Sequence, residues 1–308
     1  MRIMLLLAAA LLARAQSPLA KTPLGLDAFM PVPADNQLTA EKIAQGRKLF
    51  SDTRLSRSQT VACSTCHDAQ QAFTDGRNVA EGVFGRHGKR NAPTLVNRGY
   101  GTAQFWDGRA KSLEEQVLKP IQDPTEMDMT LAEVTARLGI GERIVAEALA
   151  SYVRTIRSGN SPVDRYLTRG QGLTAEEQLG LSVFRVKGNC VACHVGPNFS
   201  DERFHNTGIA WRDGKYSDEG RSAVTGRAED RGAFKTPTLR EVARTAPYMH
   251  DGSIRTLEEV IEHYDRGGTP NPQLDPEIRP LQLSPDEKRA LAAFLRALSG
   301  EVTAGDRY

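Results

Sequence analysis

Apolar residues recur at helical spacing in the middle of the chain. They lie three and four positions apart, and so along one face of a helix, at Ile144, Val145, Ala148, Leu149, Tyr152, Val153 and Ile156. Such a stripe usually packs against a core, and we assign it that role. The stretch SGNSP at 158–162 should then end the helix and begin a linker.

Two further amphipathic segments resemble each other. LTAEKIAQGRKLF spans 38–50, and LTAEEQLGLSVF spans 173–184. Thr39 and Thr174 are suited to cap the N-termini of helices, and Thr174 forms a capping box with Glu177. This weak internal repeat predicts two copies of one helical unit.

The rest of the chain contains one more clear helix and few strand patterns. SPDE at 284–287 has a serine cap, a proline at the first helical position and a glutamate at the third, so a closing helix should run to near Gly300. The stretch from about 195 to 237 has little periodicity, and a loop that long usually has a function or covers something. We expect a mainly α fold with long loops and few strands.

The N-terminus has the pattern of a secretory signal peptide. MRIMLLLAAALLARAQS contains an early arginine, an apolar run from 3 to 13 and an Ala-Arg-Ala cleavage site that ends at Ala15. The run is too short to span a bilayer. We assign residues 1–15 to the signal peptide, with an uncleaved anchor as the alternative, and expect a periplasmic protein with no membrane span in the mature chain.

The overall composition is that of a soluble globular protein. The 308 residues are 39% hydrophobic and 25% charged, with a formal net charge of +2. This length leaves room for one large or two small cores. The nearly balanced charge gives no indication of binding to nucleic acid or to an anionic membrane surface.

All four cysteines lie in two Cys-x-x-Cys-His boxes. The boxes consist of Cys63, Cys66 and His67, and of Cys190, Cys193 and His194. Two thiols at this spacing can form thioethers with the vinyl groups of a haem, and the following imidazole can bind the iron. A thioredoxin-like pair needs no histidine, and zinc sites prefer cysteine pairs that lie closer in sequence. We therefore predict haem c at both boxes, with His67 and His194 as proximal iron ligands.

Each box follows one copy of the repeated helix. We therefore predict two cytochrome c-like helical domains, residues 16–165 and 166–308, each with one covalently bound haem. The far side of each iron decides the function. An iron closed by Met or His only passes electrons, whereas an open iron can bind peroxide.

A candidate general base lies between the boxes. Ser112 and Glu115 form a capping box, so a helix should begin at Leu113 and Glu114 should lie in its first turn. Glu114 is either a surface carboxylate favoured by the helix dipole or a base that moves protons on peroxide beside a haem. The residues alone favour the surface carboxylate.

Several ordered motifs resemble those of bacterial di-haem cytochrome c peroxidases and their relative MauG, an enzyme that oxidises tryptophans in a partner protein. The motifs are CSTCHDAQQAFTDG, RNAPTL, QFWDGRAKSLEEQ, FKTPTLREVARTAPYMHDG and LEEVIEHYDRGG, and the similarity covers roughly residues 37–299. It implies that the N-terminal haem is peroxidatic and that the C-terminal haem receives electrons from a small donor protein.

The resemblance also implies roles for particular residues. The family's active-site glutamine and glutamate correspond to Gln104 and Glu114, so we interpret Glu114 as catalytic. A calcium ion between the domains would be bound at Asn91, Thr245 and Pro247. Neither of these two segments has the spacing of an acidic calcium loop.

The first iron should differ from that of many family members, which close it at rest with a histidine in the loop before the RN pair. The corresponding position here is Val83, so we expect this iron to be open at rest and to need no reductive activation. His87 lies four residues later and could ligate the iron if the loop shifted. A histidine on a glycine-rich loop is more often solvated.

The second iron should differ as well. Ordinary members supply a methionine shortly after the LEEV motif, where this chain has Tyr264, and MauG uses a tyrosine at the matching place. A phenolate lowers the potential of ferric iron relative to a thioether. Met249 is the alternative ligand, in which case Tyr264 is a packed aromatic, and His250 and His263 are weaker candidates.

A tryptophan commonly lies between the two haems in this family. The chain has only Trp106 and Trp211, and the segment PTLVN at 93–97, where we would expect that tryptophan, has none. The coupling between the haems should therefore differ from that of the family.

Three functions are consistent with these patterns. The leading hypothesis is a periplasmic peroxidase that reduces hydrogen peroxide to water with electrons from a small cytochrome c or cupredoxin. The second is a MauG-like enzyme that oxidises residues of a partner protein through a high-valent di-haem state. The third is a non-enzymatic electron carrier with two closed haems. Family members often form dimers, so a homodimer is a further expectation.

Overall fold

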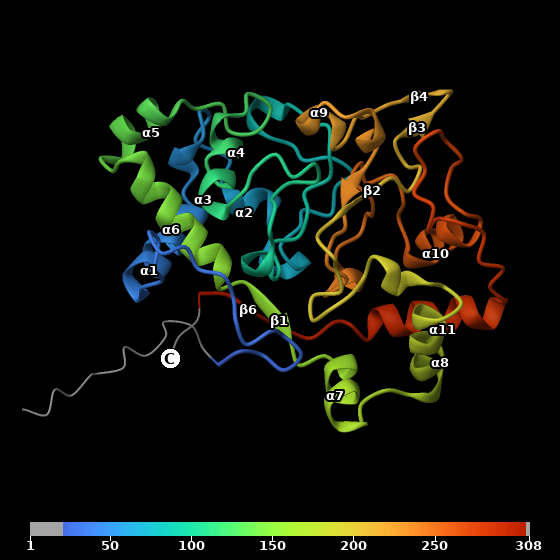
Figure 1. Cartoon of the computed structure of the whole chain (residues 1–308). Helices are drawn as coiled ribbons and strands as arrows, with labels where there is room; N and C mark the ends of the chain where they lie inside the picture. The colour runs from blue at the N-terminus through green and yellow to red at the C-terminus, as the bar shows by residue number, and fades with distance from the viewer. Residues whose placement is uncertain (1–20, 306–308) are drawn as a thin grey trace, which may run out of the picture.

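A computed structural model describes residues 21–305 (Figure 1). The predicted signal peptide lies outside the described residues. The described chain is rich in helices and has few strands, as the sequence predicts. Within it, no helix combines the length and the apolar character needed to cross a membrane.

Two pairs of crossing helices frame the two halves of the chain. Helix α1 (Ala40–Phe50) packs against α6 (Glu142–Arg154), and α8 (Ala175–Arg185) packs against α11 (Pro285–Arg296). Helices α1 and α8 are the two segments of the sequence repeat. The repeat therefore corresponds to the same packing arrangement in each half.

Each crossing depends on a glycine. A Cβ atom at Gly46 would lie 1.9 Å from the carbonyl oxygen of Ala148, and one at Gly180 would lie 1.9 Å from that of Ala290. Four residues after each glycine, a phenylalanine contacts an aromatic ring of the partner helix, at a centroid distance of 5.0 Å in both halves. Only glycine lets the two backbones approach so closely.

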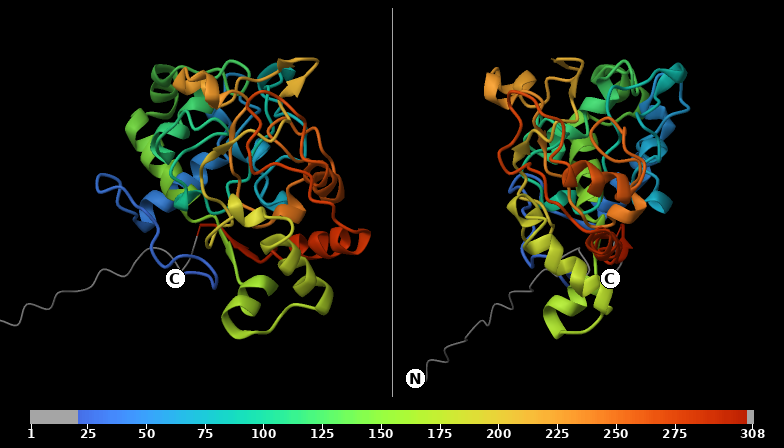
Figure 2. Two further views of the ribbon diagram at one scale, coloured as in Figure 1. Left: turned by 45° about the vertical axis from the view of Figure 1, so that its right-hand side comes forward. Right: turned by 90° about the vertical axis from the view of Figure 1, so that its right-hand side faces the viewer.

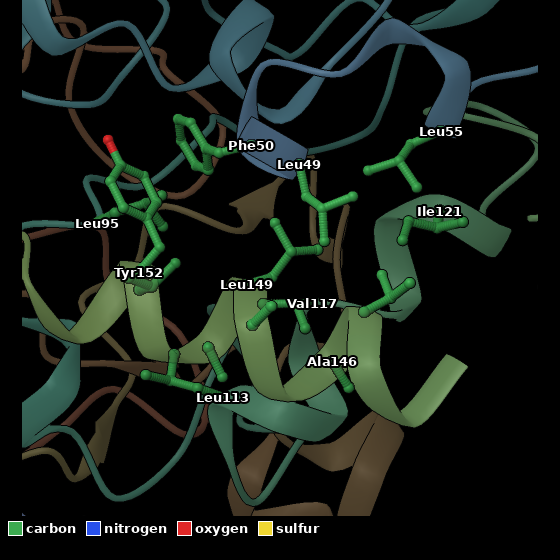
Figure 3. Packing of buried hydrophobic residues seen from close by; sticks show 14 of the residues in the cluster. Leu49, Phe50, Leu55, Leu95, Leu113, Val117, Ile121, Ala146, Leu149 and Tyr152 are labelled. Atoms are coloured by element: carbon green, nitrogen blue, oxygen red, sulfur yellow. The ribbon is translucent and has the colours of Figure 1, made fainter. Parts of the chain in front are cut away.

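Each half has its own hydrophobic core. The first core lies around α1 and α6 and includes Leu49, Phe50 and Leu149 (Figure 3). The second includes Phe184 and Phe294. The division into domains at residues 165 and 166 stays a prediction, and helix α7 (Pro162–Arg169) spans that point.

The strands of residues 21–305 are short and form three antiparallel pairs. β1 (Arg157–Gly159) pairs with β6 (Glu301–Thr303), β2 (Phe204–His205) with β5 (Phe234–Lys235), and β3 (Trp211–Arg212) with β4 (Lys215–Tyr216). The other helices are α2 (Cys63–Cys66), α3 (Leu113–Gln116), α4 (Lys119–Gln122), α5 (Leu131–Leu138), α9 (Ser222–Thr225) and α10 (Leu257–Asp265).

The predicted linker at 158–162 is wrong. Instead of a linker, the chain forms β1 and then begins α7 with Ser161 as its cap. The cause is a long-range contact, because β6 returns from the end of the second half to pair with β1. The two halves consequently lie side by side and share this strand pair, while α7 projects at one end of the molecule (Figures 1 and 2).

Candidate functional site

Both cysteine boxes face one cavity with a volume of 1260 Å³. Cys66 and His67 of the first box line its wall, and so do Cys190, Cys193 and His194 of the second. The boxes lie over a hundred residues apart in the sequence. The fold alone brings them to a common space.

The two histidines are held in the same way. Nδ1 of His67 lies 3.0 Å from the carbonyl oxygen of Phe73, and Nδ1 of His194 lies 2.8 Å from that of Phe199. Because a carbonyl only accepts, each Nδ1 carries the hydrogen and each Nε2 keeps its lone pair. Burial lowers the pKa of both imidazoles, which favours the neutral form that binds metals.

The four cysteines form no disulfide with one another. Burial raises the pKa of Cys63, Cys66 and Cys190 to about 12. A reactive redox pair would instead need a lowered thiol pKa. These three thiols are therefore poorly suited to disulfide exchange.

These residues fit haem c. At each box the two cysteines would carry the thioether bonds, and the free Nε2 of His67 or His194 would bind the iron. The cavity wall also includes apolar side chains of both cores, such as Leu95 and Leu291. Bound haem would supply the redox-active iron.

The two predicted catalytic residues lie in different surroundings. Gln104 is buried and lines the cavity. Glu114 is not among the lining residues, although its neighbour Leu113 is. Arg154 donates to both carboxylate oxygens of Glu114, at 2.6 and 3.1 Å, and Asn36 donates at 2.6 Å. Their catalytic roles stay predictions.

The ion pair keeps Glu114 ionised. Burial alone would raise the pKa of Glu114, but hydrogen bonds from Arg154 and Asn36 lower it overall. The carboxylate is therefore in the form that can accept a proton.

Helix α10 presents one face to the cavity. Leu257, Val260, Ile261 and Tyr264 recur at helical spacing and all line the wall. Burial raises the pKa of Tyr264, with the two thiols of the second box acting in the same direction. Met249 lines the same wall, so the choice between Tyr264 and Met249 as an iron ligand stays open.

The other histidines named from the sequence are placed differently. His263 is buried, with its Nε2 2.9 Å from the carbonyl oxygen of Thr207, and it is not a lining residue. His250 lines the cavity and stacks on Phe234 at a centroid distance of 3.7 Å. His87 is exposed at the rim of the cavity, and Val83 is fully buried in the first core.

The residues predicted to bind calcium are all found at the cavity wall. Asn91, Thr245 and Pro247 all line it, and the backbone N–H of Asn91 donates to the carbonyl oxygen of His250 at 2.8 Å. The side-chain amide of Asn91 donates to the carbonyl oxygen of Arg77 at 2.7 Å. Calcium binding at these residues stays a prediction.

Of the two tryptophans, only Trp106 lines the cavity. Its indole N–H donates to the carbonyl oxygen of Asn91 at 2.9 Å. Trp211 lies in the β3–β4 hairpin against Tyr216, at a centroid distance of 4.8 Å.

Sequence reasoning missed two features of the wall. Glu126 lines the cavity near the first box, and burial raises its pKa to about 7. Arg98 also lines the cavity, donates to Gln104, and forms an ion pair with Glu202 from the other half of the chain. No local pattern marks either feature, because both depend on contacts between distant segments.

Comparison with known proteins identifies the family of the chain. A family described as "Di-haem cytochrome c peroxidase" matches residues 40–144. The methylamine utilization protein MauG of Methylorubrum extorquens is 40% identical over 294 residues, covering 89% of this chain and 83% of that protein. The cytochrome c551 peroxidase of Pseudomonas aeruginosa is 34% identical, covering 89% and 84%.

A solved structure is also similar. It is a MauG-like protein associated with microbial copper homeostasis, 36% identical to this chain, with a TM-score of 0.81. The alignment covers 90% of this chain and 94% of that one.

A helix-rich fold with two covalent-haem boxes on one cavity defines a cytochrome-type oxidoreductase. More narrowly, the chain belongs to the di-haem cytochrome c peroxidase and MauG family, and it is an enzyme of the cytochrome c peroxidase type. The resemblance of the motifs is thereby confirmed. The relatives include both cytochrome c peroxidases and MauG.

Proposed function

We propose that this protein reduces hydrogen peroxide to water in the periplasm, with electrons from a small cytochrome c or cupredoxin. The observation that carries the proposal is the shared cavity, in which each box offers an imidazole with a free Nε2 and Gln104 lines the wall. Two electrons and two protons convert one peroxide into two waters.

The protein residues would orient peroxide and manage its protons. Gln104 can contact a ligand in the cavity. Glu114 is ionised and hydrogen-bonded, so it would act as a base only by exchanging its contacts with Arg154 and Asn36. Haem c at the second box would receive the electrons.

The test is peroxide-dependent oxidation of reduced cytochrome c by the haem-loaded protein. We expect a high-spin component in the resting ferric spectrum that disappears when peroxide is added. Glu114→Gln should lower turnover on the order of 10²-fold. Glu115→Gln, which changes the adjacent half-buried carboxylate of α3, should keep most of it. Undiminished turnover in Glu114→Gln would overturn the catalytic role of Glu114.

The position of Tyr264 favours a second function, the MauG-like oxidation of residues in a partner protein. Tyr264 lies on the cavity face of α10, beside the second box. In the same assay this function predicts little oxidation of cytochrome c and a long-lived peroxide-oxidised form. Tyr264→Phe should then alter the spectrum of the second haem, whereas Met249→Leu should leave it unchanged.

Calcium at Asn91, Thr245 and Pro247 and a homodimer are further parts of the proposal. They rest on the resemblance to the family.

A further inference from the structure

A buried ionic cluster lies behind Gln104. Nε of Arg98 donates to Oε1 of Gln104 at 3.2 Å. The two terminal nitrogens of Arg98 donate to the two carboxylate oxygens of Glu202, at 2.7 and 3.1 Å. Nζ of Lys235 lies 3.6 Å from the same carboxylate. All four side chains have little exposure to solvent.

The hydrogen bond from Arg98 fixes the orientation of the side-chain amide of Gln104. A guanidinium has donors and no acceptor, so the atom that faces Arg98 must be the amide oxygen. Nε2 is then turned away from Arg98. Among residues 21–305 no group accepts a hydrogen bond from it, and Gln104 lines the cavity. The amide N–H groups are therefore the part of Gln104 that is available to a ligand.

Arg98 itself is held in one position. Besides the paired contact with Glu202, it donates to the carbonyl oxygen of Ala103 at 2.8 Å. It also folds over Gly101, where a Cβ atom would lie 2.0 Å from its terminal nitrogen. A paired arginine–carboxylate contact fixes orientation as well as distance. The guanidinium thus has little freedom to release Gln104.

The anchor of this cluster comes from the second half of the chain. Glu202 lies shortly after the second box, and the backbone N–H of its neighbour Asp201 donates to the carbonyl oxygen of Cys193 at 2.8 Å. Glu202 has a φ of 57°, in the left-handed region that residues other than glycine rarely adopt. Its backbone is thus held in an uncommon conformation that directs the carboxylate to Arg98.

We infer that Arg98 and Glu202 are positioning residues, which hold Gln104 with its amide N–H groups toward the cavity so that they donate to a bound ligand oxygen. The loop of the second box thereby orients a hydrogen-bond donor that the first half of the chain contributes to the shared cavity. The inference rests on the proposed function in one respect, because it takes peroxide as the ligand that Gln104 contacts.

The test uses carbon monoxide as a probe on the reduced, haem-loaded protein. A donor beside bound carbon monoxide lowers its C–O stretching frequency, which infrared spectroscopy measures. Gln104→Leu should raise the frequency, and Glu202→Gln should shift it in the same direction. Gly101→Ala should do so too, because it displaces the guanidinium without removing a charge. Glu229→Gln, an exposed carboxylate of the same loop region, is the control.

Turnover of peroxide is the second readout. Gln104→Leu should lower kcat/KM on the order of 10²-fold, as for loss of one oriented donor. The two positioning variants, Glu202→Gln and Gly101→Ala, should lower kcat/KM less. If Gln104→Leu or both positioning variants leave the C–O frequency unchanged, or if the wild-type protein binds no carbon monoxide, the inference is overturned. If the frequencies shift but peroxide is not turned over, the inference holds and the proposed function fails.

Discussion

At the scale of single residues, Glu126 is the least expected feature of the cavity. It lines the wall near the first box, and in the described part of the chain no hydrogen bond or ion pair reaches its carboxylate. Burial raises its pKa to about 7, Asp123 acts in the same direction, and Arg109 acts against them. The thiol of Cys66 is a further neighbour.

Glu126 should make stability depend on pH. Its pKa is raised in the folded state, so between about pH 4.5 and 7 the folded protein binds more protons than the unfolded chain. The free energy of unfolding should therefore fall as the pH rises through this window, by about 1.4 kcal/mol per unit of pKa difference. Urea unfolding of the haem-loaded protein at several pH values measures this slope.

The matched variants are Glu126→Gln and Glu176→Gln. The first should flatten the slope, and the second, at an exposed position in α8, should keep it. Equal slopes in wild type and Glu126→Gln would show that the carboxyl does not titrate in this window.

The residues of the boxes could be predicted from the sequence, whereas Glu126 could not. The two cysteines and the histidine of a box lie within a few consecutive residues, so their relation in space follows from the local sequence. The environment of Glu126 follows only from burial and from the charges of segments that fold against it. For the same reason the sequence assigned a role to Glu114 but could not place it in an ion pair with Arg154.

At the scale of elements, the two glycine crossings define the helix pairs. Gly46 in α1 and Gly180 in α8 both face a backbone carbonyl of the partner helix. The sequence shows the repeat that contains them, and the capping boxes at Thr174 and Ser284 are present as predicted. It does not show which helix each glycine meets, because the partners lie about a hundred residues later.

Alanine at either glycine should destabilise the protein. A methyl group at these positions collides with a backbone oxygen, so Gly46→Ala and Gly180→Ala should each lower the free energy of unfolding by about 1–3 kcal/mol. Alanine's higher helix propensity, worth about 1 kcal/mol, acts in the opposite direction. Urea denaturation measures the difference.

Lys48→Ala serves as the control because it changes an exposed position of α1. It should leave the midpoint of unfolding nearly unchanged. An increase in stability for either glycine variant would contradict the close approach of the helices.

At the scale of the whole molecule, the end of the chain ties the two halves together. After α11 the chain returns to pair β6 with β1, and Val302 packs against the first core. Glu241, fully buried, accepts hydrogen bonds from the Ser158 hydroxyl at 2.5 Å and from the backbone N–H of Gly300 at 2.6 Å. The sequence division into two consecutive units misses this return.

Val302→Asp should therefore loosen the first core rather than the second. A charge at this position must either be buried or break the contact, and burying an unpaired charge is costly. Hydrogen exchange followed by mass spectrometry should show faster exchange in α6 and little change in α11. Val224→Asp, at an exposed valine of α9, is the control and should change neither helix. Faster exchange in α11 alone would contradict this assignment.

The sequence by itself predicts the attachment chemistry of the protein, with one haem c at each box. The thiols and imidazole of each box are local groups, the motifs in, between and after the boxes resemble those of the family, and helix caps and apolar periodicity predict the main helices. Only the tertiary structure decided that both boxes share one cavity, that Glu114 pairs with Arg154, and that Glu202 of one half holds Gln104 of the other through Arg98. These contacts join segments 40 to over 100 residues apart, and no local pattern encodes which distant groups will meet.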